Sequence, residues 1–593
     1  METSLAVIDY VIIGVYMAFS IGVGIYFSKK ASASTDDYFV GGRSMPWWLI
    51  GTSMVATTFA SDTPLAMTEM VREHGLWRNW FWWNACIAQV MAVFLFARLW
   101  RRARVTTDNE LLEIRYHGKP AAALRGFKAV YFAVIFNFLV MGWVIRAMAA
   151  VVTTMMDVNQ WVAITGCIIV ALVYAVLSGF YGVVATDLVQ FVIAIGGSIY
   201  LAVIAVSKIG GIDVLKAKIM DNPDQGQKIF DLFPPLSGEI GGSFVGFLLF
   251  MLVMWWAHPY SDGGGYIIQR MSSCKNEKHS LLATLYFTVL NMVRGWPWII
   301  VAMVSLVLFP DLSGTKHGDT GAYPMVMNTY LTAGFKGLLV TSFLAAFMST
   351  IDTHLNWGAS YLMNDVYQRF IKPEASQKHY VRVTQLIVVL LMVGAGIVAG
   401  LLTSISAAWE FAFLMGSGLG LVLVLRWFWW RITAISEIVA LGTSAFLAFL
   451  NLILTYTIPD MVIFGFTVAE MPLHIKAFLI IPVTIVAWVV ATFATRPTPT
   501  ATLIGFYKRV RPGGLWKVIP EELRNSEDNI LGIGFVWDWL AGLALSFGLT
   551  FGTGALIFKE WKMAAIYMGA AALGGFRVYL TIRKIPDTDD AEA

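Results

Sequence analysis

The chain has 593 residues, of which 58% are hydrophobic and 13% are charged, and its formal net charge at pH 7 is +4. Soluble domains carry about twice this share of charged residues, so the composition excludes an ordinary soluble protein. The mean hydropathy of +0.68 and the long apolar runs indicate an integral membrane protein whose spans are helices, because strands of a barrel would be short and alternating.

The apolar runs follow one another along the chain, and about fifteen of them are long enough to cross a bilayer as helices. We expect these spans near residues 5–28, 46–68, 78–98, 128–154, 159–178, 184–208, 241–270, 280–309, 335–368, 380–402, 405–430, 433–456, 473–495, 531–557 and 562–582. The first run lacks the basic segment of a signal peptide, so we expect it to remain as a helix. No soluble domain is inserted between the spans.

Basic residues predict how the chain crosses the membrane, because cytoplasmic connections are enriched in lysine and arginine. They gather after alternate spans: Lys29, Lys30 and Arg43; Arg98, Arg101, Arg102, Arg104, Arg115, Lys119 and Arg125; Arg270, Lys275 and Lys278; Arg369, Lys372, Lys378 and Arg382; Arg426 and Arg431; Arg496, Lys508, Arg509, Arg511 and Lys517. We therefore expect a multi-pass protein of the cell membrane (inner or plasma), with the N-terminus outside and the C-terminus cytoplasmic. The net charge reflects this topology and not a nucleic-acid partner.

Two spans contain helix breakers and small polar residues at membrane depth: GTSMVATTFASDTP at 51–64 and MWWAHPYSDGGGYIIQR at 254–270. Proline and consecutive glycines disfavour a continuous helix, and backbone freed within a membrane is tolerated only where it is buried in protein or lines a cavity. Such a pair at matching positions is typical of transporters built from inverted repeats. For either segment alone, a packing kink between neighbouring helices is the alternative.

The pair of broken spans divides the chain into units. We expect an N-terminal helix with a cytoplasmic loop (1–45), a first five-helix repeat (46–208), an extracellular loop (209–240), a second five-helix repeat (241–432) and C-terminal extra helices (433–593). The first helix of each repeat is the broken one. The three cysteines, Cys86, Cys167 and Cys274, show neither metal-ligand spacing nor a disulfide framework.

Six motifs cover most of residues 1–435 and are specific when taken together. They are DYFVGGRSMPWWLIGTSMVATTFAS (37–61), TTDNELLEIRY (106–116), GFYGVVATDLVQ (179–190), GGGYIIQR (263–270), FLAAFMSTIDTHLNWGASYLMNDVYQRF (343–370) and RWFWWR (426–431). They resemble the sodium/solute symporter family, which includes sodium/glucose and sodium/proline cotransporters. The resemblance implies an all-α membrane protein with a LeuT-type bundle of five plus five inverted-repeat helices, here with one N-terminal and about four C-terminal extra helices.

The resemblance also implies sodium ligands. The conserved site of the family maps onto the carbonyls of Ala56, Phe59 and Ala346 and the hydroxyls of Ser349 and Thr350, and the further sodium of some members maps onto Asp187. Independently of the resemblance, hydroxyl and carbonyl oxygens suit a hard cation, and a carboxylate at membrane depth indicates function by default. As alternatives, the hydroxyls could bond to carbonyls of their own helix, and Asp187 could form a salt bridge to a neighbouring helix.

The positions at which sugar-transporting relatives bind their solute differ in this chain. It has Asp62 and Thr63 on the first core helix, Trp83 and Asn84 on the second, and Gly264 where relatives have an asparagine. A galactose-type site is therefore not supported. The remaining candidates for solute binding are Arg146, His258, Asp262, Arg294 and Asp352.

Arg146 and Arg294 lie deep in apolar runs, where arginine is costly unless it faces a partner or a wet cavity. The planar guanidinium suits a carboxylate or phosphate in two-point contact. One hypothesis is that either arginine binds an anionic group of the solute. The alternative is a structural pair with one of the deep acidic residues, which are Asp62, Asp262, Asp352 and Glu410.

Asp352 and His354 stand two residues apart on one expected helix and therefore point about 200° away from each other. They cannot form a tight local pair. Ser349, Thr353 and Asn356 share one face of that helix, with Asp352 at its edge. The family pattern explains neither Asp352 nor His354.

We expect a sodium-coupled symporter that imports a small organic solute by alternating access, with one or two sodium ions per cycle as the only metal. The solute is expected to be anionic, such as a sugar acid or a carboxylate, with a neutral sugar or polyol as the alternative. A transporter-like membrane sensor ranks low because no signalling domain is appended, and the broken helices argue against a channel. No motif supports an enzyme. The expected partners are the solute, sodium and the lipid bilayer, and we expect a monomer.

Overall fold

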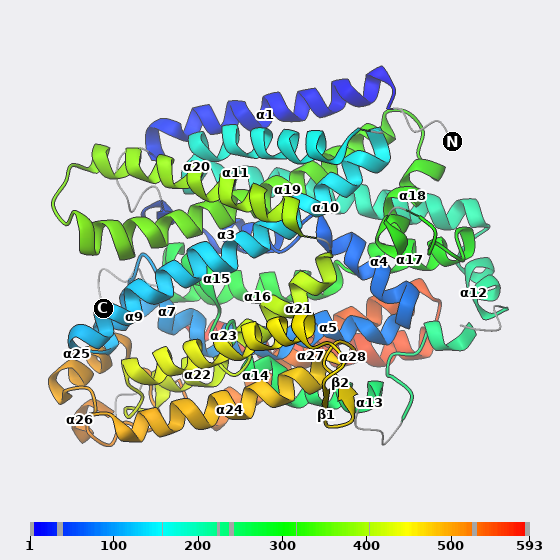
Figure 1. Ribbon diagram of the computed structural model, residues 1–593. Helices are drawn as coiled ribbons and strands as arrows, with labels where there is room; N and C mark the ends of the chain where they lie inside the picture. Colours follow the sequence, from blue (N-terminus) through cyan, green and yellow to red (C-terminus); the bar gives the residue numbers. More distant parts are fainter. Residues whose placement is uncertain are drawn as a thin grey trace.

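The computed structural model describes residues 5–31, 39–156, 158–221, 226–236, 242–315, 317–402, 404–524 and 530–587. Asp37 and Tyr38 of the first motif, and the side chains of Lys29 and Lys30, lie outside what is described. The described chain is a bundle of helices that run side by side, with α1 along one edge and α24 along the opposite one (Figure 1). The predicted all-helical class is confirmed, since helices satisfy their own backbone in an apolar surrounding.

The chain up to residue 236 contains many short elements as well as long helices. They are α1 (Val7–Ala31), η1 (Gly41–Arg43), α3 (Trp47–Thr57), α4 (Asp62–His74), η2 (Leu76–Asn79), α5 (Trp80–Trp83), α6 (Ala85–Met91), η3 (Ala92–Phe96), α7 (Ala97–Ala103), α8 (Glu110–Arg115), α9 (Gly118–Val130), η4 (Tyr131–Phe136), α10 (Asn137–Met156), α11 (Gln160–Ile209), α12 (Ile212–Met220) and η5 (Gly226–Ile229).

Residues 242–428 have the same character. Their elements are α13 (Ser243–Leu249), η6 (Phe250–Met254), α14 (Trp255–Ala257), α15 (Gly265–Ser273), α16 (Glu277–Val293), α17 (Trp296–Leu308), η7 (Gly318–Gly321), α18 (Ala322–Tyr330), α19 (Phe335–Ser360), η8 (Tyr361–Ile371), α20 (Gln377–Leu401), α21 (Ile405–Gly416) and α22 (Gly420–Phe428).

The C-terminal part adds helices around the core and a small antiparallel ribbon. Its elements are α23 (Ala434–Thr457), β1 (Val462–Ile463), β2 (Phe466–Thr467), α24 (Leu473–Ala494), α25 (Thr500–Val510), α26 (Glu521–Arg524), α27 (Ile533–Ile557) and α28 (Trp561–Arg583). The pair α27 and α28 is tied to the core by the indole of Trp296, which donates to the carbonyl of Thr550 at 2.7 Å.

Within the described residues, twelve helical stretches are long and apolar enough to cross a membrane. The other three expected spans are interrupted or shorter: α3 with α4, the first part of α11, and the segment from α13 to α15. The first and last described residues lie toward opposite ends of the bundle, as an odd number of crossings requires (Figure 1).

The long element α11 comprises two limbs that lie against each other. The hydroxyls of Tyr174 and Thr186 are hydrogen-bonded although they are 12 residues apart. Along a straight helix this separation would be about 18 Å. The limb that ends near Ala175 and the limb from Phe180 onward therefore fold back on one another and correspond to two separate expected spans.

Both predicted helix breaks are present. The first lies between Thr57 and Asp62, where α3 ends and α4 begins. The second lies between α14 and α15, where Gly263 and Gly264 have φ angles of +116° and +68°. A β-carbon on Gly264 would stand 1.9 Å from Cδ1 of Tyr260, so only glycine fits at this position.

Helix α19 occupies the middle of the bundle. It is buried continuously from Leu339 to Ser360 and packs against α1, α3, α10 and α11. The polar residues of α19 therefore all face other protein segments, and their partners reveal the site.

We expect Gly264→Ala to lower the unfolding temperature of the purified protein. Left-handed backbone disfavours alanine by about 1–2 kcal/mol, and the added methyl group would push Tyr260 aside. Gly22→Ala in α1 is the matched control, because nothing lies within 4 Å of its β-carbon position and alanine favours a helix. Equal unfolding temperatures for Gly264→Ala and the wild type would contradict the assigned break.

Candidate functional site

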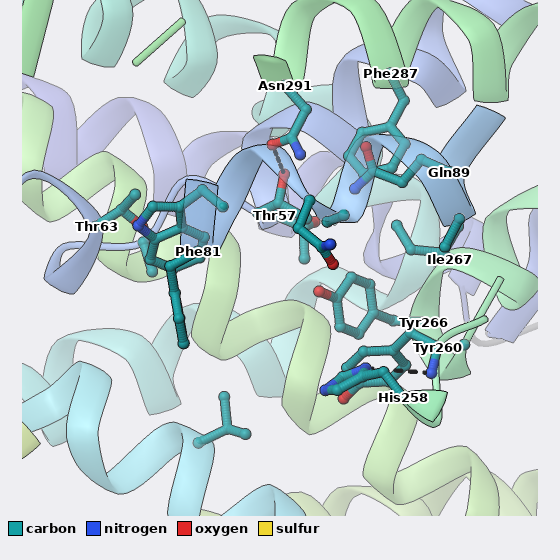
Figure 2. A pocket seen from close by; sticks show the side chains of 18 of the residues that line it. Thr57, Thr63, Phe81, Gln89, His258, Tyr260, Tyr266, Ile267, Phe287 and Asn291 are labelled. Atoms are coloured by element: carbon teal, nitrogen blue, oxygen red, sulfur yellow. Dashed lines mark hydrogen bonds between the residues drawn. The ribbon is translucent and has the colours of Figure 1, made fainter. Parts of the chain in front are cut away.

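A cavity of about 380 Å³ lies between the two helix breaks. Its walls come from α4, α5, α6, α10, α14, α16, α19 and α21. In Figure 2, His258, Tyr260 and Tyr266 gather on one side, while Asn291 and Gln89 approach from another. The cavity has the size of a pocket for a small organic molecule.

Most of the predicted solute-binding residues line this cavity: Asp62, Thr63, Trp83, Asn84, His258, Gly264 and Arg294. Arg146, Asp262 and Asp352 are not among its lining residues in the described part of the chain. Asp262 instead accepts a hydrogen bond of 2.6 Å from Nη2 of Arg426, whose Nη1 donates to Glu437 at 3.3 Å. The structure thus gives Asp262 a partner that the sequence did not indicate.

Arg294 holds the backbone of the first break. The amide of Phe59 donates to the carbonyl of Ala56, so the carbonyl of Val55 loses its regular helical partner. Nη1 of Arg294 donates to the carbonyl of Val55 and Nη2 to that of Thr58, both at 2.5 Å. The guanidinium therefore caps the broken helix, while its Nε has no hydrogen-bond partner among the described residues.

Thr350, one of the predicted ligands of the conserved sodium site, contacts the end of α3 at the first break. The hydroxyl of Thr350 donates to the carbonyl of Thr57 at 2.9 Å and to that of Ala346 at 3.1 Å. The hydroxyl of Ser349 instead donates to Oδ1 of Asp187 at 2.5 Å. The bond from Thr350 to Ala346 is the own-helix bond expected as the alternative, but the same hydroxyl also reaches across to α3.

Asp187 lies in a buried network with Arg270. The closest atoms of the two side chains are 3.5 Å apart. The hydroxyl of Ser53 donates to Oδ2 of Asp187 at 2.5 Å and accepts from Nε of Arg270 at 2.8 Å. Nη2 of Arg270 donates to the hydroxyls of Thr57 and Thr353 at 2.9 and 2.7 Å. The arrangement joins α3, α11, α15 and α19 around one compensated charge.

Sequence reasoning missed the role of Arg270. The residue was counted among the basic residues of a cytoplasmic connection, but its side chain is 1% exposed. Its position in GGGYIIQR, about one and a half helical turns after the second break, is the signal that could have found it. The structure contains a salt bridge between Asp187 and Arg270. A salt bridge was the alternative to sodium binding that the sequence left open for Asp187.

His354 and Asp352 lie on opposite sides of α19, as their spacing predicts. His354 lines the cavity, and its Nδ1 is 2.6 Å from Oδ1 of Asn137. The amide of Asn137 in turn donates to the carbonyl of His354 at 2.8 Å. His354 thus ties α19 to α10, whereas Asp352 faces α1 and α11.

Ion pairs close the interior on the side of α7 and α9. They are Asp262 with Arg426 at 2.6 Å, Asp365 with Arg125 at 2.7 Å and Asp108 with Lys128 at 2.9 Å. The hydroxyl of Thr107 and the amide of Asn109 also donate to Asp365. The motif TTDNELLEIRY therefore fastens the first repeat to the end of α19 and η8.

The model of a known family, the sodium:solute symporter family, matches residues 38–441 of the chain. A sodium/glucose cotransporter of Vibrio parahaemolyticus is 25% identical over 465 residues, which cover 75% of this chain and 84% of the relative. Sodium/myo-inositol cotransporter 2 of Oryctolagus cuniculus is 23% identical over 480 residues, covering 76% and 70%. Sodium/glucose cotransporter 4 of Mus musculus is 26% identical over 415 residues, covering 65% and 59%.

Among solved structures, the fold is similar to that of a substrate-bound, outward-open Na⁺-coupled sialic acid symporter. The TM-score is 0.68, the sequence identity is 20%, and the match covers 83% of this chain and 99% of the other. A likeness at this identity establishes the shared bundle of helices. The predicted LeuT-type fold is thereby confirmed.

We expect Arg270→Gln to destabilise the protein by about 3–5 kcal/mol, because it leaves the buried carboxylate of Asp187 without its compensating charge. The double variant Asp187→Asn with Arg270→Gln should recover much of this loss, since both charges are then absent. Thermal unfolding of the purified single and double variants measures the coupling.

Arg369→Gln serves as the matched control, because its pair with Glu113 is half exposed and such pairs contribute about 0–1 kcal/mol. Strictly additive effects of the Asp187 and Arg270 substitutions would show that the two side chains do not depend on each other.

Proposed function

This chain belongs to the sodium:solute symporter family, and we propose that it imports a neutral, hydroxyl-rich solute such as a sugar or a polyol together with sodium. Members of the family and the relatives found are transporters and not enzymes. The observation that carries the proposal is the mixture of unpaired donors and acceptors in the cavity. Oδ1 of Asp62 and Oε1 of Gln89 are unpaired acceptors, and Nε1 of Trp82 is an unpaired donor, within the described residues.

A hydroxyl group satisfies such a mixture because it both donates and accepts hydrogen bonds. The aromatic walls support the same class of solute, since the C–H faces of a sugar ring pack well against indole and phenyl rings. Trp83, Trp143 and Trp409 line the cavity, and the last two lie beside the carboxylate of Asp62. Relatives named for glucose and myo-inositol agree with this class.

The anionic solute expected from the sequence stays the second candidate, and Arg294 is the observation that favours it. Its Nε–H lacks an acceptor and its side chain lines the cavity. Its other two nitrogens are committed to the backbone of the first break, and Arg146 does not line the cavity. An anion would also meet the carboxylate of Asp62, which makes the neutral solute the better-supported candidate.

The sodium ion is proposed to bind between the first break and α19. Its ligands would be the carbonyls of Ala56, Phe59 and Ala346 and the hydroxyls of Ser349 and Thr350. Supporting this, Thr350 already bridges α3 and α19 through the carbonyl of Thr57. A cation at this point would hold the broken helix against α19 and so prepare the cavity for the solute before the two repeats move.

Each positive charge carried inward gains about 2.3 kcal/mol for every 100 mV of inside-negative potential. A second sodium would double this driving force for a neutral solute. Asp187 is the position that the resemblance implies for it. Both carboxylate oxygens of Asp187 accept hydrogen bonds from serine hydroxyls, and Arg270 lies alongside, so a cation there would compete with an existing positive charge.

We further propose that the C-terminus is cytoplasmic and the N-terminus outside. The described C-terminal end lies at the same end of the bundle as α7 and α25, whose last turns carry Arg101, Arg102, Lys508 and Arg509 (Figure 1). Cytoplasmic segments are enriched in these residues. One chain contains both repeats and the cavity between them, so a monomer is sufficient for transport.

We expect Thr350→Ala to raise the sodium concentration needed for half-maximal thermal stabilisation of the purified protein at least tenfold. The substitution removes one oxygen ligand, and about 1.4 kcal/mol corresponds to a factor of ten in affinity. Ser360→Ala on the same helix is the control, because its hydroxyl only bonds to the carbonyl of Trp357. The proposed site is wrong if both variants respond to sodium like the wild type.

We expect neutral sugars or polyols, tested with saturating sodium, to raise the unfolding temperature of the purified protein, whereas monocarboxylates and sugar acids do not. Asp62→Asn should weaken the response, since an amide offers one acceptor where the carboxylate offers two oxygens. Stabilisation by acids alone, lost in Arg294→Lys, would establish the second candidate instead.

A further inference from the structure

A second group of buried polar atoms lies on the side of α19 that faces away from the cavity. Its centre is Asp352, which is 2% exposed. Neither carboxylate oxygen of Asp352 has a hydrogen-bond partner within the described residues. No other described aspartate or glutamate has both side-chain oxygens buried and unpaired in this way.

The neighbours of Asp352 come from α1 and α11. Tyr16 of α1 reaches the same face of α19, because its hydroxyl is 3.9 Å from the sulfur of Met348, one helical turn before Asp352. Asp352 interacts electrostatically with Tyr16 and with Tyr174 of α11. The fold-back of α11 therefore brings both of its limbs to this one position.

Gln190 and Ser20 complete the surroundings with oxygen atoms. Nε2 of Gln190 donates to the hydroxyl of Tyr16 at 3.0 Å, and its Oε1 is buried without a partner among the described residues. In either orientation of the amide group, one of its two polar atoms has no hydrogen-bond partner among the described residues. Ser20 lies one helical turn after Tyr16 on α1, and its hydroxyl is fully buried beside that tyrosine.

An ionised carboxylate in such a place requires a compensating positive charge. Arg270 is already bonded to Ser53, Thr57 and Thr353 and lies 3.5 Å from Asp187. The described residues show no ion pair between Asp352 and a lysine or arginine. The described residues therefore supply no positive charge that pairs with an ionised Asp352.

We propose that Asp352, Gln190, Tyr16 and Ser20 form a sodium site of their own, separate from the site at Ser349 and Thr350. Carboxylate, amide and hydroxyl oxygens are the hard ligands that sodium prefers. The site rests on the proposed sodium coupling and deepens it, because it moves the second ion from Asp187 to a carboxylate that lacks a partner. Asp187 then serves as the fixed counter-charge of Arg270.

The site also assigns a role to α1, which lies outside the two repeats. A sodium ion there would join α1 to α11 and α19, the helix that carries the ligands of the first ion. Binding at one site would thus stiffen the helix that forms the other. Cooperative sodium binding follows, with a Hill coefficient that approaches the number of sites.

The test measures sodium bound to the purified protein by equilibrium dialysis with radioactive sodium, and sodium-dependent thermal stabilisation in parallel. We expect two ions in the wild type and one in Asp352→Asn, with the Hill coefficient falling toward one. Gln190→Leu should weaken the second ion by tenfold or more without removing the first. Both variants are expected to keep the first ion. Its retention shows that the protein is folded, so the loss of the second ion then reports a lost ligand.

The control is Asp538→Asn in α27, which removes an aspartate that is largely buried and already paired with Arg577 at 2.8 Å. It should leave both ions bound. If Asp352 simply carries a proton, Asp352→Asn is a close mimic and will bind the same sodium as the wild type, which overturns the inference. Loss of the second ion in Asp187→Asn but not in Asp352→Asn also overturns it.

Failure of the inference and failure of the proposed function give different results. A wild-type protein that binds no sodium contradicts sodium coupling through either site. A wild type that binds one ion, lost in Thr350→Ala and kept in Asp352→Asn, leaves the proposed function intact and rejects the site at Asp352.

Discussion

The interrupted first helix of the core leaves carbonyl groups without helical partners in the middle of a bundle, and the rest of the site is arranged to satisfy them. Backbone polar groups in such a place must be paired because water is not available to them. Two side chains from the second repeat do this. Arg294 holds the carbonyls of Val55 and Thr58, and Thr350 holds that of Thr57. The first break is therefore held to the second repeat through its own backbone carbonyls.

Buried charges follow the same logic of pairing. Arg270 is compensated by Asp187, and Arg426 by Asp262 and Glu437. The pair of Arg270 with Asp187 joins the helix after the second break to the first repeat, whereas Arg426 joins the second break, at Asp262, to α22 and α23. A buried pair of this kind contributes little net stability but makes the loss of one partner costly. The pairs therefore specify which helices lie together, and rearranging them requires the helices to move as units.

Much of the architecture could be predicted because the membrane environment restricts the possibilities. The length of an apolar run predicts a membrane-spanning helix. The glycine run at 263–265 predicts a helix break independently of tertiary contacts. The sequence predicted less well which of the ten candidate residues for solute binding line the cavity. Asp62 and Gly264 line the cavity, whereas Asp262 turns to Arg426. Asp262 and Gly264 are two residues apart in a non-helical segment, where periodicity does not predict the direction of a side chain.

The sequence by itself determined the class of the protein, its spans and its two breaks, because these depend on composition and on local backbone preferences. The opposite directions of Asp352 and His354 also followed from helical geometry alone. Only the tertiary structure decided which charge compensates which. Arg270 and Asp187 are 83 residues apart, and nothing local indicates that α11 folds back and brings them together. Partner choice among buried charges depends on how distant helices pack, and it leaves Asp187 paired and Asp352 without a partner from the described chain.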